Sequence, residues 1–155
     1  MGKLIWHEYA RYVSITASIY AVWAGFFGLF YRKFFWDFVG GILRNPGGLQ
    51  ASRSSAVFIT LIVKFPIIQS MAIILGLLIV ALEYPLPLLK TWAIYRNFIV
   101  RIVLLIFQTF FGILYYQGTN SSIWSLIAIM CYGQAILLGE RMAEAKENRA
   151  KGGGV

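Results

Sequence analysis

The stretch of residues 102–139 contains no Asp, Glu, Lys or Arg, and this restricts what the chain can fold into. The stretch is too long for one crossing of a bilayer, because a membrane-spanning helix needs about 20 apolar residues. Residues 118–121, with the sequence GTNS, interrupt it with the residue types of a tight turn. We therefore predict two consecutive spans that form a hairpin, at about 97–117 and 121–139.

Two further apolar stretches precede this hairpin. Residues 12–31 are an uncharged run of 20 residues, and a longer apolar region covers about 57–83. The fold class that we predict is all-α: a polytopic membrane protein with four transmembrane helices in one bundle, forming a single domain over residues 1–155. Residues 140–155 are predicted to continue the fourth helix as a cytoplasmic tail with a flexible glycine end.

The composition agrees with a membrane protein. Hydrophobic residues make up 59% of the chain and charged residues 13%, whereas a soluble domain is nearer half and a quarter. Fourteen Lys and Arg against six Asp and Glu give a net charge of +8. These basic residues lie beside and between the apolar stretches, so we predict membrane lipids, and not nucleic acid, as their partners.

The distribution of positive charge predicts the orientation. With the N-terminus inside, nine of the fourteen Lys and Arg lie on the cytoplasmic side and five on the other. Cytoplasmic loops carry an excess of Lys and Arg in membrane proteins. Both termini are therefore predicted to lie in the cytoplasm.

The loop after the first span is unusually apolar. Placed on a helix, residues 33–44 show one narrow polar stripe that contains Lys33, Asp37 and Arg44. Such a helix suits the plane of the membrane interface, and the alternative is an irregular loop whose rings pack on the bundle. The residues predicted to contact lipid or a partner are Phe34, Phe35, Trp36 and Phe38.

Small residues recur on one face of the first span. Small side chains let two helices approach closely, and helix association in lipid depends on such contact. This face serves either the bundle itself or a partner subunit. Its residues are Ser14, Ala17, Ala21, Gly25 and Gly28.

Glu83 and Arg101 lie near the same predicted membrane boundary, and we predict that they pair. The alternative is a transport role for these two intramembrane charges. Three isolated amides, of Gln69, Gln108 and Gln134, are expected to form hydrogen bonds between helices.

The residues needed for catalysis are scarce. His7 is the only histidine and Cys131 the only cysteine, so the chain can form neither a histidine metal cluster nor an intramolecular disulfide. Lys3, His7 and Arg11 are interpreted as a basic stripe facing lipid headgroups. We predict no catalytic, cofactor-binding or metal-binding residues and no enzyme activity.

Three segments of the chain resemble a family of small four-span membrane proteins from fungi. They are residues 6–11 (WHEYAR), residues 30–41 (FYRKFFWDFVGG) and residues 45–48 (NPGG). The resemblance covers nearly the whole chain and implies a eukaryotic membrane, either an endomembrane or the plasma membrane. It implies no assigned activity and no catalytic residues.

Function is predicted by elimination. We expect a non-enzymatic accessory or scaffold subunit that binds a larger membrane protein or lipid. The alternative is a small channel or transporter that acts as a homo-oligomer, and an enzyme is the third class considered.

Overall fold

The computed structural model describes residues 4–32, 54, 56–84, 95 and 97–140. The secondary-structure elements within these ranges are helical, which confirms the predicted all-α class. The elements in chain order are α1 (Trp6–Tyr31), α2 (Ala56–Ile59), the π-helical turn η3 (Thr60–Lys64), α3 (Ile67–Glu83), α4 (Phe98–Ile113), the 3-10 turn η5 (Tyr116–Gly118) and α5 (Thr119–Leu137).

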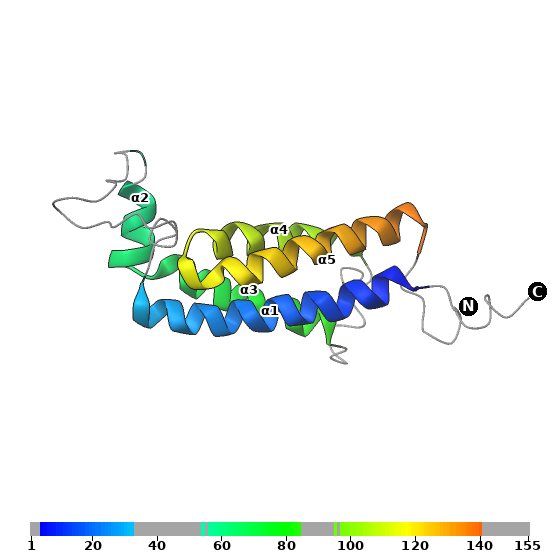
Figure 1. Ribbon diagram of the computed structural model, residues 1–155, viewed down its shortest axis with the longest axis horizontal. Helices are drawn as coiled ribbons and strands as arrows, with labels where there is room; N and C mark the ends of the chain where they lie inside the picture. The colour runs from blue at the N-terminus through cyan, green and yellow to red at the C-terminus, as the bar shows by residue number, and fades with distance from the viewer. Residues whose placement is uncertain (1–3, 33–53, 55, 85–94, 96, 141–155) are drawn as a thin grey trace, which may run out of the picture.

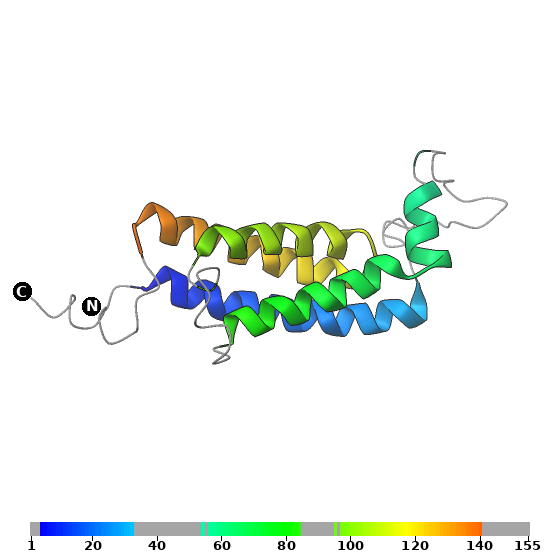
Figure 2. The same ribbon diagram turned by 180° about the vertical axis from the view of Figure 1, so that it is seen from behind.

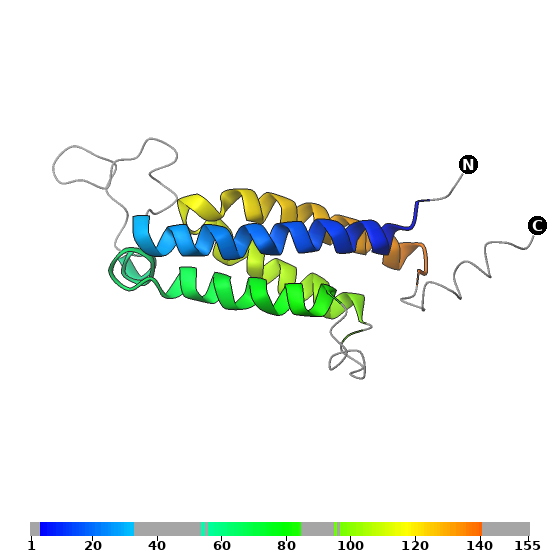
Figure 3. The same ribbon diagram turned by 90° about the horizontal axis from the view of Figure 1, so that it is seen from below.

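Four of these helices run side by side along the long axis of the molecule (Figure 1). α1 lies against both α3 and α5, while α4 packs on α3 and α5 from the other side (Figures 2 and 3). α1 and α4 begin, and α3 and α5 end, at the same end of the bundle. We call this the charged end, because His7, Glu83, Arg101 and Glu140 lie there.

Within the described residues, two helices are long and apolar enough to cross a membrane, Trp6–Tyr31 and Tyr116–Leu137. A third span results if the pair Ala56–Lys64 and Ile67–Glu83 is counted as one. α4, with 16 residues, is shorter than the usual span. Length and composition thus identify two or three candidate spans.

The region predicted as one span over 57–83 is bent in the structure. Its two halves, Ala56–Lys64 and Ile67–Glu83, meet at 71°. Pro66 explains the bend, because it has no backbone N–H and disfavours a helical conformation in the residue before it. Phe65 is accordingly extended, with φ −119° and ψ 112°. As a result α2 and η3 lie across the end of the bundle opposite the charged end (Figure 1).

The turn between α4 and α5 lies a few residues earlier than predicted. α4 ends at Ile113 and α5 begins at Thr119, so residues 119–121 belong to the first turn of α5. Two glycines allow the close return of the chain. A Cβ added at Gly112 would lie 2.9 Å from the carbonyl oxygen of Gly118. The Ser122 hydroxyl also donates to the Thr109 carbonyl at 3.0 Å.

The fourth helix does not continue into the predicted tail. α5 ends at Leu137, and Gly139 adopts the left-handed conformation with φ +68°. The Glu140 N–H then donates to the Ala135 carbonyl at 2.9 Å and the Gly139 N–H to the Ile136 carbonyl at 2.9 Å. This is the Schellman arrangement that ends many helices at a glycine. Residues 141–155, the rest of the predicted tail, lie outside the described residues.

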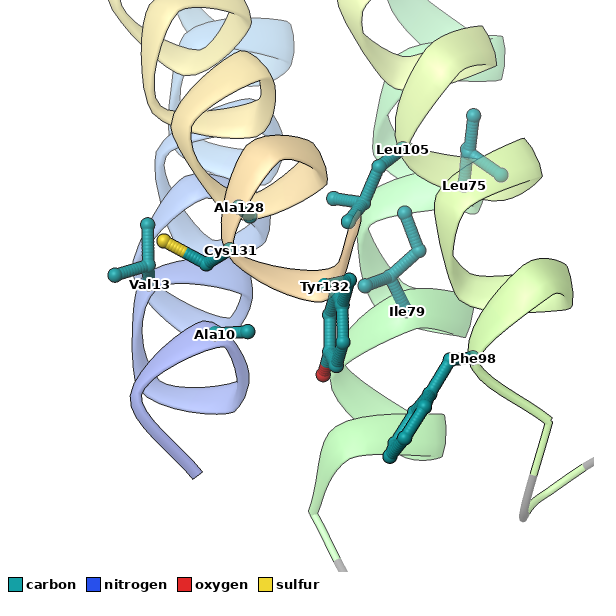
Figure 4. Close-up of a cluster of buried hydrophobic side chains, with 9 residues drawn as sticks. All are labelled: Ala10, Val13, Leu75, Ile79, Phe98, Leu105, Ala128, Cys131 and Tyr132. Atoms are coloured by element: carbon teal, nitrogen blue, oxygen red, sulfur yellow. The ribbon is translucent and has the colours of Figure 1, made fainter. Parts of the chain in front are cut away.

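The core near the charged end draws side chains from all four long helices (Figure 4). Tyr132 lies between the α1 and α5 side of this core and the α3 and α4 side (Figure 4). Its ring centroid is 5.6 Å from that of Phe98. Buried small residues let α1 and α5 approach, as Ala10 and Ala128 are both fully buried. The buried cluster comprises Ala10, Val13, Leu75, Ile79, Phe98, Leu105, Ala128, Cys131 and Tyr132.

Candidate functional site

The charged end of the bundle contains a buried ion pair between Glu83 and Arg101. Glu83 is the last residue of α3, and Arg101 lies one turn into α4. Their side chains are 0% and 2% exposed, and Arg101 Nη1 donates to Glu83 Oε2. The α4 N-terminus that carries Arg101 is capped by Asn97, whose side chain accepts from the Ile99 N–H at 2.9 Å.

Tyr132 of α5 completes this pair. Its hydroxyl donates to Glu83 Oε1 at 2.6 Å and accepts from Arg101 Nη1 at 3.3 Å. Both oxygens of the Glu83 carboxylate therefore receive a hydrogen bond. We call Glu83, Arg101 and Tyr132 the ion-pair cluster.

Arginine side chains also satisfy the carbonyl groups at the end of α3. Arg101 Nη2 donates to the Leu82 carbonyl at 3.1 Å and to the Tyr95 carbonyl at 2.9 Å. From α1, Arg11 Nε donates to the Glu83 carbonyl at 2.8 Å. The last carbonyls of a helix have no partner within the helix and carry its partial negative charge. The ion-pair cluster and Arg11 thus join α1, α3, α4 and α5 through polar contacts.

A second contact at the charged end joins the start of α1 to Glu140, three residues beyond the end of α5. The carboxylate of Glu140 accepts from the backbone N–H groups of Trp6 and His7 at 3.0 and 2.8 Å. His7 Nδ1 lies 2.7 Å from Glu140 Oε2. Ile5, at the N-cap of α1, has no side chain that can cap the helix. Glu140 therefore supplies the missing cap from a distant part of the chain.

The environment of Glu140 acts on its ionisation in two directions. Partial burial alone would raise the pKa of this carboxyl group. The hydrogen bonds from His7 and Trp6 outweigh burial and hold the pKa of Glu140 below its ordinary value. Since His7 is buried against Glu140, the interpretation that it faces lipid headgroups is wrong.

The small face of α1 packs inside the bundle. All five of its residues are buried. A Cβ at Gly25 would meet the side chain of Ile73 and lie 3.1 Å from the Gln69 carbonyl. A Cβ at Gly28 would lie 2.8 Å from the Gln69 side chain and 3.1 Å from the Tyr115 ring. Of the two alternatives for this face, the structure shows contact within the chain.

Two of the three isolated glutamines form hydrogen bonds between helices. Gln108 Nε2 donates to Ser125 Oγ at 2.8 Å, which joins α4 to α5. Gln69 Nε2 donates to the Ile62 carbonyl at 2.9 Å and to the Gly28 carbonyl at 3.4 Å. Gln134 is half-buried. The predicted contact residues Phe34, Phe35, Trp36 and Phe38 lie outside the described residues.

The outer face of α1 carries a row of exposed aromatic side chains that we did not predict. Trp23, Phe27 and Tyr31 follow one another at a spacing of four, with ring centroids 5.1 and 6.4 Å apart. Trp23 is 63% exposed and Phe30 is 83% exposed. The spacing of four was visible in the sequence. We call this set the α1 aromatic face: Tyr9, Tyr12, Tyr20, Trp23, Phe27, Phe30 and Tyr31.

Among the described residues, no three His, Cys, Asp or Glu side chains gather in a way that could hold a metal ion. No curated protein and no solved structure matches the chain. A family model does match, over residues 1–140, and its description is a domain of unknown function, DUF7727. The match covers most of the chain, from before α1 to the Glu140 cap. The chain therefore belongs to the DUF7727 family.

Proposed function

We propose that this chain is a non-enzymatic, four-span integral membrane protein that acts as an accessory or scaffold subunit of a larger membrane protein. The observation that carries the proposal is the α1 aromatic face, with Tyr20 and Trp23 exposed near the middle of the helix. A eukaryotic endomembrane or the plasma membrane is its proposed location.

The placement of charge supports four spans. Between the charged end and the opposite end of the bundle, the four long helices carry no charged residue. The charged residues of α1 end at Arg11, those of α3 and α4 are Glu83 and Arg101, and α5 has none. Large apolar side chains on all four helices point outward and are exposed, such as Ile74, Phe110 and Met130. Burying them in lipid would stabilise the protein by roughly 25 cal/mol per Å² of apolar surface.

The orientation that we propose places the charged end in the cytoplasm. Cysteine tags at Gly2 and Val155 in a Cys131→Ser background should resist an impermeant thiol reagent in sealed vesicles whose cytoplasmic face is on the inside. Lys64→Cys, an exposed position at the opposite end, is the matched control and should react. Reaction of either terminal tag before permeabilisation would contradict this topology.

The polar atoms of the α1 aromatic face favour a protein partner over lipid. Tyr and Trp prefer the membrane–water interface, where the hydroxyl and the indole N–H find hydrogen-bond partners. Tyr20 and Trp23 lie far from both ends of α1, where hydrocarbon offers neither donor nor acceptor. A transmembrane helix of a partner would bury both rings and accept their hydrogen bonds. The small face of α1 cannot serve such a partner, because it is filled by α3 and α5.

Trp23→Leu is expected to weaken partner binding about 30-fold or more, since large aromatic anchors at an interface contribute about 2 kcal/mol or more. The measurement is quantitative co-purification in mild detergent after chemical crosslinking in the native membrane. Phe110→Leu is the matched control, because Phe110 is 48% exposed on α4, away from the α1 aromatic face.

Retention of a stoichiometric partner by Phe110→Leu and its loss from Trp23→Leu, at equal thermal stability, supports the proposal. Equal recovery from both variants contradicts it. Recovery of a symmetric oligomer of this chain alone favours the homo-oligomeric channel or transporter instead.

A further inference from the structure

We propose that Arg11 is the binding site for the phosphate group of an anionic phospholipid at the charged end of the bundle. The inference rests on the membrane embedding proposed above, and it is independent of the protein partner.

Arg11 forms no ion pair with a carboxylate of the described residues. The positive charges of Arg11 and Arg101 lie within electrostatic range of each other. The Glu83 carboxylate is engaged by Arg101 and Tyr132 on its two oxygens. Arg11 reaches only the backbone carbonyl of Glu83. Arg101 and Tyr132 therefore occupy the one carboxylate that lies beside both guanidinium groups, and Arg11 forms no ion pair with it.

The other acidic side chains that the structure describes at this end do not pair with Arg11. Glu8 lies one turn before Arg11 on α1, is exposed, and forms no ion pair with it. Glu140 is engaged by His7 and the N-terminus of α1. Among the described residues, therefore, no ion pair at Arg11 competes with an external phosphate.

The guanidinium of Arg11 is held in place with its outer donors available. Its Nε donates to the Glu83 carbonyl at 2.8 Å, while Nη1 and Nη2 form no hydrogen bond with the described residues. A guanidinium presents its donors in a planar fork that matches two oxygens of a phosphate. Fixing the side chain beforehand lowers the entropy lost when the ligand binds.

The surroundings of Arg11 suit a lipid headgroup better than a free anion. Arg11 is half-buried, and its chain neighbour Tyr12 is 67% exposed. Tyr84, the residue after Glu83, is 63% exposed. Aromatic rings of this kind sit at the headgroup level of a bilayer. With the charged end in the cytoplasm, Arg11 would meet the leaflet that is rich in anionic lipid.

Native mass spectrometry of the full chain in detergent tests the site, with phosphatidylserine and phosphatidylcholine titrated separately. We expect the wild type to bind the anionic lipid about tenfold more tightly. Both lipids offer a phosphate, but the choline group of phosphatidylcholine neutralises it, whereas phosphatidylserine keeps a net negative charge. Arg11→Gln should remove this preference, and Arg11→Lys should retain part of it because the charge remains. Arg32→Gln is the matched control at the other end of α1, where the outer donor Nη1 of Arg32 already bonds to the Lys64 carbonyl at 3.4 Å.

Equal binding of the two lipids by the wild type overturns the proposal, whatever the variants do. So does an unchanged preference in Arg11→Gln. Inorganic phosphate that displaces phosphatidylserine at equal concentration would show a free-anion site and would overturn the assignment to lipid. Lipid binding at Arg11 and the proposed function can fail separately. Loss of partner binding leaves these lipid titrations unaffected. A protein that purifies without detergent would contradict membrane embedding itself.

Discussion

Glu83→Gln is expected to lower the free energy of unfolding by about 3–5 kcal/mol, as loss of one partner from a buried ion pair does. The substitution keeps the size of the side chain but leaves the Arg101 guanidinium without its counter-charge, in a position that is 2% exposed. Arg101 cannot become neutral, because a guanidinium stays protonated in proteins. Reversible unfolding of the purified protein in mixed detergent micelles measures the loss.

Two further variants separate the charge from the contacts of the ion-pair cluster. The double variant Glu83→Gln, Arg101→Gln should recover much of the loss, because no unpaired charge remains. Tyr132→Phe removes only the hydroxyl that donates to Glu83 Oε1 and should cost about 1.5–3 kcal/mol, the range for a hydrogen bond to a charged group. If Glu83→Gln destabilised the protein no more than Tyr132→Phe does, the pair would not be a major source of stability.

Gly118→Ala is expected to destabilise the protein by about 1–3 kcal/mol or more through overpacking of the α4–α5 turn. The new methyl group would meet the Gly112 carbonyl oxygen and would lie 2.7 Å from Cζ of Tyr115. Backbone atoms of a tight turn cannot move aside as the end of a flexible side chain can, so the two helices must separate. Thermal unfolding in detergent reports the change.

Gly133→Ala is the matched control for the turn. Gly133 lies inside α5, and a Cβ there would meet no atom within 4 Å. Alanine favours a helix over glycine by up to about 1 kcal/mol, so this variant should be neutral or slightly more stable. A loss of stability as large at Gly133 as at Gly118 would contradict the close contact that the structure shows at the turn.

The helical class and the small face of α1 could be predicted because both follow from local patterns. An uncharged run long enough to cross a bilayer favours a helix, whose backbone hydrogen bonds all lie within the segment. Residues spaced by about four positions fall on one side of that helix. The same rule would have found Trp23, Phe27 and Tyr31, whose spacing was present but not used.

The bend at Pro66 and the end of α5 near Gly139 could also have been predicted from local residues. Proline removes a donor from the helix, and glycine adopts the left-handed conformation readily. We instead extended apolar and helical patterns through both residues. The mean hydropathy of a segment changes little when one or two residues interrupt its helix. The predicted boundaries of the second span and of the fourth helix therefore differ from those in the structure.

Only the tertiary structure decided which polar groups meet when they lie far apart in the sequence. Glu83 and Arg101 are close in sequence, and a shared boundary was enough to predict their pairing. Glu140 caps an α1 that begins 134 residues earlier, and Arg11 reaches across 72 residues to the end of α3. Local sequence determines that a helix end needs a partner for its N–H or C=O groups. Which distant side chain supplies it depends on how the helices pack, because packing alone brings those atoms within hydrogen-bonding distance.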